Sequence, residues 1–173
     1  SAVMYAYYGG LKQSLAGDDI SGIQSVWGAY PADPVNDGSF ATATNITGLI
    51  GENGQVALGG RSLAGTADRD YYYVTAPSDT TGTMVVTMQA SGLSSASPRL
   101  QLYNGNQSVI GGVSAPESYG GTVTYTVTGV TPGKSYYILA LAASAMGSYG
   151  SYGLLVNFGT SYQPPIQPPD TTV

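Results

Sequence analysis

The sequence predicts a mainly β protein, an antiparallel jelly-roll-like β-sandwich preceded by one short helix. Residues 122–128 alternate Thr with Val or Tyr, which is the period of two that a strand with one buried face requires. About eight short runs of this kind, separated by turn signals such as Asn53-Gly54, are typical of a sandwich. The chain has 15 Tyr and only 9% charged residues, the opposite of a disordered composition, so we expect it to fold.

The helix is predicted from apolar residues that recur at helical spacing near the start of the chain: Ala16, Ile20, Ile23 and Trp27. They form one face of an amphipathic helix of about three turns. Asp18 and Asp19 lie in its first turn, where the helix dipole favours acids, and Gly28 is a natural end. Adjacent residues on a helix point about 100° apart, so Asp18 and Asp19 are predicted to be structural rather than an acid/base pair.

The rest of the chain divides into a connector, a run of strands and a tail. Two prolines and an Asn-Asp-Gly turn mark residues 29–44 as a connector that leads into the next domain. Residues 45–160 form the sandwich, and residues 161–173, with two Pro-Pro pairs, form an extended tail. The strands predicted within the sandwich are 71–74, 84–89, 100–103, 122–128, 135–141 and 154–158.

Composition excludes several classes of function. The chain contains 0 His and 0 Cys, so it supplies no His general base, no His ligand for zinc and no Cys nucleophile. A net charge of −5 and the lack of any basic run argue against nucleic acid as a partner. No apolar run approaches the ~20 residues of a membrane span. The low Lys content and the abundance of Thr, Ser and Gly indicate a secreted bacterial protein.

Asp68 and Asp70 form a D-x-D pair just before a predicted strand. One interpretation is a calcium site, because Ca²⁺ prefers clustered carboxylate and carbonyl oxygens. The other, which we favour, is a turn in which Asp caps backbone donors and Arg69 neutralises the pair. Three further acids could supply calcium ligands from elsewhere in the chain: Asp33, Asp37 and Glu52.

The 15 tyrosines indicate a binding surface, since Tyr offers a flat apolar face with a polar tip. Half of the tyrosines in strands are expected to face the core. The segment 148–152 (SYGSY) is therefore the strongest candidate for exposed aromatic residues.

The start of the chain resembles the end of a matrixin catalytic domain, within the metzincin zinc peptidases. The matching segments are residues 1–5 (SAVMY) and 15–28 (LAGDDISGIQSVWG). The resemblance implies that Met4 is the Met of the Met-turn beneath a zinc site, and that Ala6 and Tyr8 wall the substrate pocket. Ala6 departs from the Pro that the family usually has there.

The same resemblance implies that Asp18 and Asp19 anchor the last helix to the Met-turn. Ala16 stands where the family usually has a Ser or Thr N-cap. The zinc motif of the family, H-E-x-x-H-x-x-G-x-x-H, precedes the Met-turn and is not in this sequence. We therefore expect a C-terminal fragment of a longer peptidase, with zinc and the catalytic domain in the missing part and no catalytic residue in this chain.

Residues 33–160 are similar to the bacterial pre-peptidase C-terminal domain, an accessory β-sandwich of secreted peptidases. The order and spacing of five segments carry the likeness: 37–44, 65–76, 100–104, 133–140 and 151–156. The implied function is a non-catalytic C-terminal module of a secreted zinc metallopeptidase. Such a module would bind a protein or polysaccharide substrate or surface, or act in maturation, and it would be inactive alone.

The alternative is an adhesion or carbohydrate-binding β-sandwich unrelated to proteolysis. A planar aromatic platform on an exposed face would favour it. In either case Ile20, Ile23 and Trp27 need a partner surface, and we expect them to bury against the sandwich or against a second copy of the chain.

Overall fold

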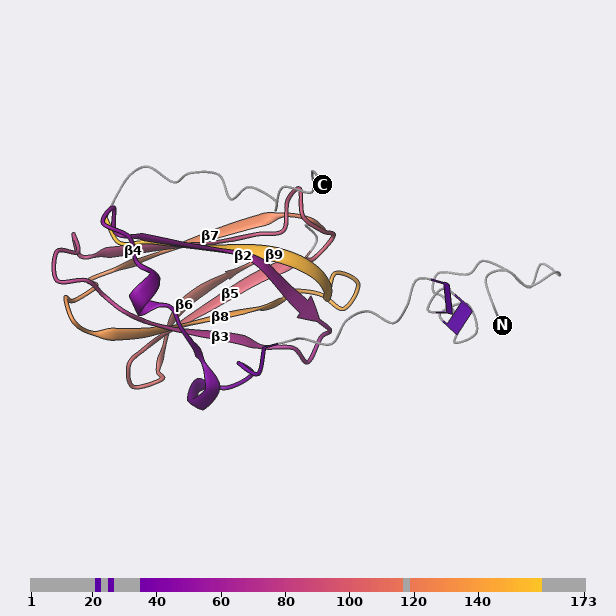
Figure 1. The fold of residues 1–173 in the computed structure, drawn as a ribbon, viewed down its shortest axis with the longest axis horizontal. Helices are drawn as coiled ribbons and strands as arrows, with labels where there is room; N and C mark the ends of the chain where they lie inside the picture. Colours follow the sequence, from indigo (N-terminus) through magenta and orange to yellow (C-terminus); the bar gives the residue numbers. More distant parts are fainter. Residues whose placement is uncertain (1–20, 23–24, 27–34, 117–118, 160–173) are drawn as a thin grey trace. The chain divides into compact units, whose positions relative to one another are not determined.

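The computed structural model describes residues 21–22, 25–26, 35–116 and 119–159 (Figure 1). The chain divides into two compact units, residues 1–32 and 33–173. In the first unit the four described residues are helical, and the Ser25 hydroxyl donates to the Gly22 carbonyl at 2.8 Å. The other residues of the predicted helix, including Ile20, Ile23 and Trp27, lie outside the described residues. The helix and its packing therefore stay predictions.

The second unit is a sandwich of two β-sheets, as Figure 1 shows. The five-stranded sheet contains, in spatial order, β1 (Thr44–Asn45), β3 (Asp70–Thr75), β8 (Ser135–Ala142), β5 (Pro98–Asn104) and β6 (Val109–Ser114). The four-stranded sheet contains β2 (Gln55–Ala64), β9 (Tyr149–Asn157), β4 (Thr83–Gln89) and β7 (Thr122–Thr128). Two three-residue 3-10 helices, η1 (Phe40–Thr42) and η2 (Thr47–Leu49), precede β2.

The mainly β prediction is confirmed, and all six predicted strands are present. Three strands were not predicted: β1, β2 and β6. Glycine pairs interrupt the alternation in two of them, and the pairing of β2 with β9 shifts register between Leu58 and Arg61, around Gly59-Gly60. The prediction of wholly antiparallel pairing is wrong at one edge, because β1 and β3 run parallel, with Thr44 opposite Tyr72.

The core lies between the sheets and follows from strand alternation. In β3 the side chains of Asp70, Tyr72 and Val74 are buried, whereas Tyr71, Tyr73 and Thr75 are partly exposed. The same alternation in β5 and β8 directs one set of residues to the core and the other to the outer face of the five-stranded sheet. The largest fully buried apolar side chains include Ile46, Leu63, Met84, Met88, Leu100, Leu102, Ile138 and Leu154. Among the described residues, no helix has the length and apolar character to cross a membrane.

Replacing a core leucine tests this assignment. Leu154 is 0% exposed in the central strand β9, so we expect Leu154→Ala to lower the free energy of unfolding by about 2–5 kcal/mol. Leu49 is 57% exposed, and we expect Leu49→Ala to change the free energy of unfolding by less than about 1 kcal/mol. Urea unfolding of both variants measures the difference. Equal losses in the two variants would contradict the position of the core.

Candidate functional site

Three tyrosines lie side by side on the outer face of the five-stranded sheet. Tyr137 of β8 is opposite Tyr73 of β3 and, on its other side, opposite Tyr103 of β5. The next row of the same face places Leu139 between Tyr71 and Gln101. Because neighbouring strands are about 4.8 Å apart, residues in such rows are within side-chain contact. Strand register therefore concentrates aromatic residues on one partly exposed surface.

A phenylalanine from outside the sheet completes this surface. The Phe40 ring of η1 lies 4.6 Å from Tyr71, 4.9 Å from Tyr103 and 5.1 Å from Tyr137, between ring centroids. Tyr73 contacts Tyr137 at 5.3 Å. We call these five residues the aromatic cluster. Each such pair contributes about 0.5–1.5 kcal/mol beyond its buried area.

The rings of the aromatic cluster are not coplanar. Phe40 is at 89° to Tyr103 and 82° to Tyr137, and Tyr71 is inclined 38° to Tyr103. These tilted and edge-to-face arrangements are the favoured ones for aromatic pairs. The face is therefore aromatic, but it is not the planar platform that would favour the carbohydrate-binding alternative.

Asp37 holds the segment that carries Phe40. Its side chain is buried, and its Oδ2 accepts a hydrogen bond from the Thr44 hydroxyl at 3.1 Å. Its backbone carbonyl accepts from the amide of Tyr71 at 3.0 Å, which ties the segment to β3. At the start of η1 the amide of Ser39 donates to the Thr42 hydroxyl at 3.2 Å. Part of the predicted connector therefore belongs to the candidate site.

Polar groups border the aromatic cluster at two ends. At one end the Tyr73 hydroxyl is 2.6 Å from the Ser135 hydroxyl and accepts from Thr75 at 3.3 Å, and these bonds lower the pKa of Tyr73. At the other end, burial and the neighbouring Tyr71 raise the pKa of Tyr103. Arg99 and Arg69 act in the opposite direction, so two cations lie within electrostatic reach of that hydroxyl.

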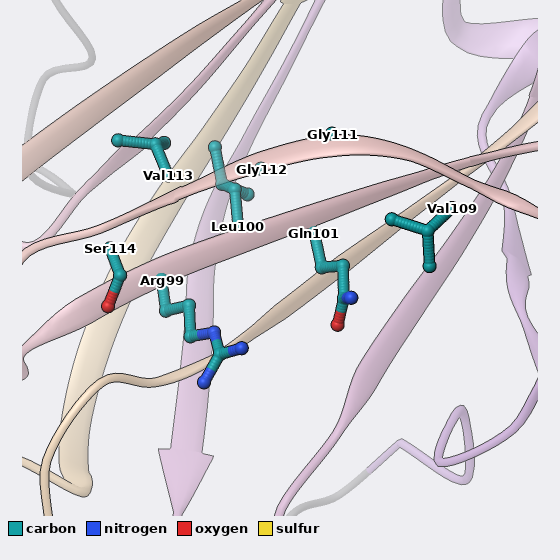
Figure 2. Close-up of a pocket in the computed structure, with 8 residues that line it drawn as sticks. All are labelled: Arg99, Leu100, Gln101, Val109, Gly111, Gly112, Val113 and Ser114. Carbon is teal, nitrogen blue, oxygen red and sulfur yellow. The ribbon is translucent and has the colours of Figure 1, made fainter.

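An open groove of about 540 Å³ continues from this face onto β5 and β6. Figure 2 shows the side chains of Arg99, Gln101 and Ser114 on one side of the two strands, with Leu100 and Val113 on the other. Arg99 is directly opposite Ser114, and Gln101 is opposite Gly112. The groove floor is bare at Gly112, because a Cβ there would lie 2.5 Å from the Leu100 carbonyl oxygen. The eight residues that line the groove include Arg99 and no acid.

Beneath the same sheet, a buried chain of hydroxyl groups connects the two sheets. Tyr152 of β9 donates to Oδ2 of Asp70, and the hydroxyls of Tyr152 and Tyr72 are 2.6 Å apart. A phenol has one proton, and that of Tyr152 is directed to Asp70, so Tyr72 must be the donor to Tyr152. Burial raises the pKa of both tyrosines far above the ordinary 10.0, and the Asp70 carboxylate adds to this in each.

A small cavity of about 70 Å³ lies beside this chain of hydroxyls. Asp37, Asp70, Tyr72 and Arg61 are among the residues that line it. The Arg61 guanidinium lies 5.9 Å from the centre of the Tyr72 ring, a distance at which a cation and an aromatic ring attract. The cavity has room for about one or two water molecules and not for a sugar or peptide.

The structure separates the two members of the D-x-D pair. Asp68 lies in a turn, where its Oδ2 accepts from the amide of Ala64 at 2.6 Å and its Oδ1 from the amide of Arg69 at 2.9 Å. Arg69 donates from Nη1 to the carbonyls of Thr66 and Asp68 rather than to a carboxylate. Asp70 points into the sandwich. These bonds agree with the turn interpretation of Asp68, and calcium binding stays a prediction.

Of the other described acids considered for calcium, Asp37 alone lines a cavity with a member of that pair. Asp37 shares the small cavity with Asp70, Glu52 is exposed elsewhere, and Asp33 is outside the described residues. Over residues 35–116 and 119–159, no group of three or more acids is placed to hold a metal ion. The residues that the matrixin resemblance assigns lie outside the described part of the chain: Met4, Ala6, Tyr8, Asp18 and Asp19.

The prediction of exposed aromatics at 148–152 is half wrong. Tyr149 is 53% exposed, but Tyr152 is 0% exposed and belongs to the buried chain of hydroxyls. The aromatic cluster was not predicted as a site. In the sequence, the alternation of Tyr71 and Tyr73 with residues that are buried in the structure was the only pattern that indicated the aromatic cluster. No pattern around Phe40 indicated that its ring belongs to the cluster.

Comparison with known proteins gives distant structural likenesses. No family model and no curated protein matches this chain. A periplasmic inhibitor of g-type lysozyme from Aeromonas hydrophila is 14% identical, with 66% of this chain and 96% of that chain covered and a TM-score of 0.44. The C-terminal carbohydrate-binding module CBM6 of a marine laminarinase from Zobellia galactanivorans is 15% identical, covering 57% and 77%, with a TM-score of 0.36.

A third likeness is to the carbohydrate-binding module CBM36, solved in complex with calcium and xylotriose. It is 20% identical, with 60% of this chain and 87% of that chain covered, at a TM-score of 0.38. At such TM-scores the likenesses carry no functional argument. The two-sheet sandwich follows from the strand pairing of this chain itself.

Stability should depend on pH through the buried tyrosines. The pKa values of Tyr72 and Tyr152 are raised in the folded state. The two groups therefore contribute fully to the free energy of unfolding below pH 10, and this contribution is lost as the pH rises above 10. We expect the free energy of unfolding to fall by up to about 1.4 kcal/mol per pH unit for each group above pH 10. Urea unfolding between pH 8 and pH 11 measures this slope.

The double variant Tyr72→Phe/Tyr152→Phe is the matched control, because it keeps both rings and removes both titrating groups. Its free energy of unfolding should be lower at pH 8 and should depend less on pH between 10 and 11. An unchanged slope in the double variant would show that these tyrosines do not cause the alkaline loss.

Proposed function

We propose that this chain is a non-catalytic carbohydrate-binding β-sandwich module that holds its ligand on the outer face of the five-stranded sheet. The observation that carries the proposal is the row Tyr73, Tyr137 and Tyr103, placed on three adjacent strands by their register. These tyrosines are partly exposed, and aromatic residues that gather at one place on a protein surface are typical of an interaction site. The groove on β5 and β6 extends the same surface.

The chemistry of the face suits a sugar. A pyranose ring has an apolar C–H side, which packs on aromatic rings, and a rim of hydroxyl groups, which need donors and acceptors. Tyrosine supplies both kinds of contact and loses little conformational entropy on binding. Around the rings, Ser135, Thr75 and Gln101 add hydroxyl and amide groups.

The inclined rings favour individual glycan chains over a flat polysaccharide surface. A crystalline surface is planar and would need several coplanar rings. Here Phe40 stands at 82° to Tyr137 and 89° to Tyr103, so the cluster presents ring edges and hydroxyls as well as ring faces. We infer that the ligand is a soluble or loosely packed chain.

The module is proposed to act outside the cytoplasm, where polysaccharide surfaces occur. Its attachment to a zinc peptidase rests on the matrixin resemblance of residues 1–28 and stays a prediction. In that arrangement the sandwich would hold the enzyme near a sugar-coated substrate. The sugar-binding proposal itself depends only on the sandwich.

Affinity gel electrophoresis of the full chain tests the proposal with soluble xylan, mixed-linkage β-glucan and polygalacturonate as probes. We expect retardation by at least one of them. Tyr103→Ala and Tyr137→Ala should each weaken that binding about tenfold or more, as central aromatic residues of interfaces commonly do. Tyr149→Ala is the matched control, since Tyr149 is exposed on the four-stranded sheet and should leave binding unchanged.

Thermal unfolding monitored by circular dichroism separates a binding defect from a folding defect. Tyr103→Phe gives a second check, because it keeps the ring and should retain most of the affinity. Loss of binding in Tyr149→Ala, with full binding in Tyr103→Ala and Tyr137→Ala, would move the site to the other sheet. No retardation by any of the three probes would contradict a carbohydrate ligand.

A further inference from the structure

The groove on β5 and β6 differs from the aromatic cluster in its charge. Arg99 is exposed in the groove, with Gln101 and Ser114 on the same side of the strands (Figure 2). Its volume of about 540 Å³ is within the range of about 300–1,000 Å³ of small-molecule sites. The lining therefore offers one permanent positive charge and two uncharged hydrogen-bonding groups. None of the lining residues is an acid that would neutralise the charge of Arg99.

This positive charge is unusual for the chain. The protein has 5 basic residues and a net charge of −5, so its surface as a whole repels anions. Arg69 and Arg99 nevertheless both act electrostatically on Tyr103 at the edge of the aromatic cluster. Arg69 is engaged with the backbone carbonyls of its turn, which leaves Arg99 as the arginine that faces the groove.

We propose that the groove on β5 and β6 binds the carboxylate of an acidic sugar unit through Arg99, so that the ligand of the module is a uronate-bearing glycan. This inference rests on the proposed function and names the class of its ligand. A guanidinium offers paired N–H donors that match the two oxygens of a carboxylate. Gln101 and Ser114 lie beside it and can bind the hydroxyl groups of the same sugar unit.

A glycine of β6 leaves the approach to Arg99 open. Gly112 lies opposite Gln101, on the face that carries Arg99, and a Cβ there would have no room against the Leu100 carbonyl. The strand therefore passes the groove without a side chain at this position. A chain lying on Tyr103 can continue over Gln101 and Gly112 and bring a later unit to Arg99, because these residues occupy successive rows of the same face.

Isothermal titration calorimetry with a matched pair of polymers tests the proposal. Polygalacturonate carries the carboxylates, and fully methyl-esterified polygalacturonate has the same backbone without the charge. We expect the wild-type chain to bind the acid at least about tenfold more tightly, and Arg99→Gln to remove most of that preference by weakening the binding of the acid far more than that of the ester. Lys134→Gln, which removes the same unit charge from a turn outside the groove, should behave as wild type.

Ionic strength provides a readout that a folding defect would not change. Binding of polygalacturonate by the wild type should weaken as salt rises, and that dependence should be smaller in Arg99→Gln. If Arg99→Gln keeps full preference for the acid while Tyr103→Ala loses binding, the acidic ligand is wrong and the sugar-binding face stands. If neither polymer binds but polyglutamate binds through Arg99, the ligand is an acidic peptide and both proposals fail.

Discussion

The strict alternation of side chains in β3 is the constraint on which both the fold and the candidate site depend. Asp70 and Tyr72 point inward and reach Tyr152 of the opposite sheet, whereas Tyr71 and Tyr73 point outward into the aromatic cluster. One strand therefore supplies the polar link between the sheets and the surface that we assign to the ligand. A shift of its register by one residue would exchange the two sets and destroy both.

The buried link explains why this sandwich tolerates a carboxylate in its interior. An isolated buried charge is very costly, and the hydroxyl of Tyr152 offsets part of that cost by donating to Asp70. Removing one member leaves the others with fewer partners, so the three residues act as one unit. A hydrogen-bonded polar group of this kind specifies how two sheets face each other more sharply than apolar packing alone.

Much of the fold could be predicted from the sequence, and most of the site could not. Regular alternation revealed the strands at 122–128 and 135–141, but Gly59-Gly60 and Gly111-Gly112 concealed β2 and β6, because glycine adds nothing to a hydrophobic pattern. The aromatic cluster joins residues as far apart in sequence as Phe40 and Tyr137. Only the strand order brings them together, and local patterns do not contain it.

The position of β9 has a consequence for biosynthesis. This strand, Tyr149–Asn157, lies between β2 and β4, so the four-stranded sheet is split until it is inserted. A ribosome that has released the chain as far as about residue 100 exposes the unpaired edges of β2 and β4, which can pair with other chains. Completion of the fold must therefore wait until the last strand has left the exit tunnel.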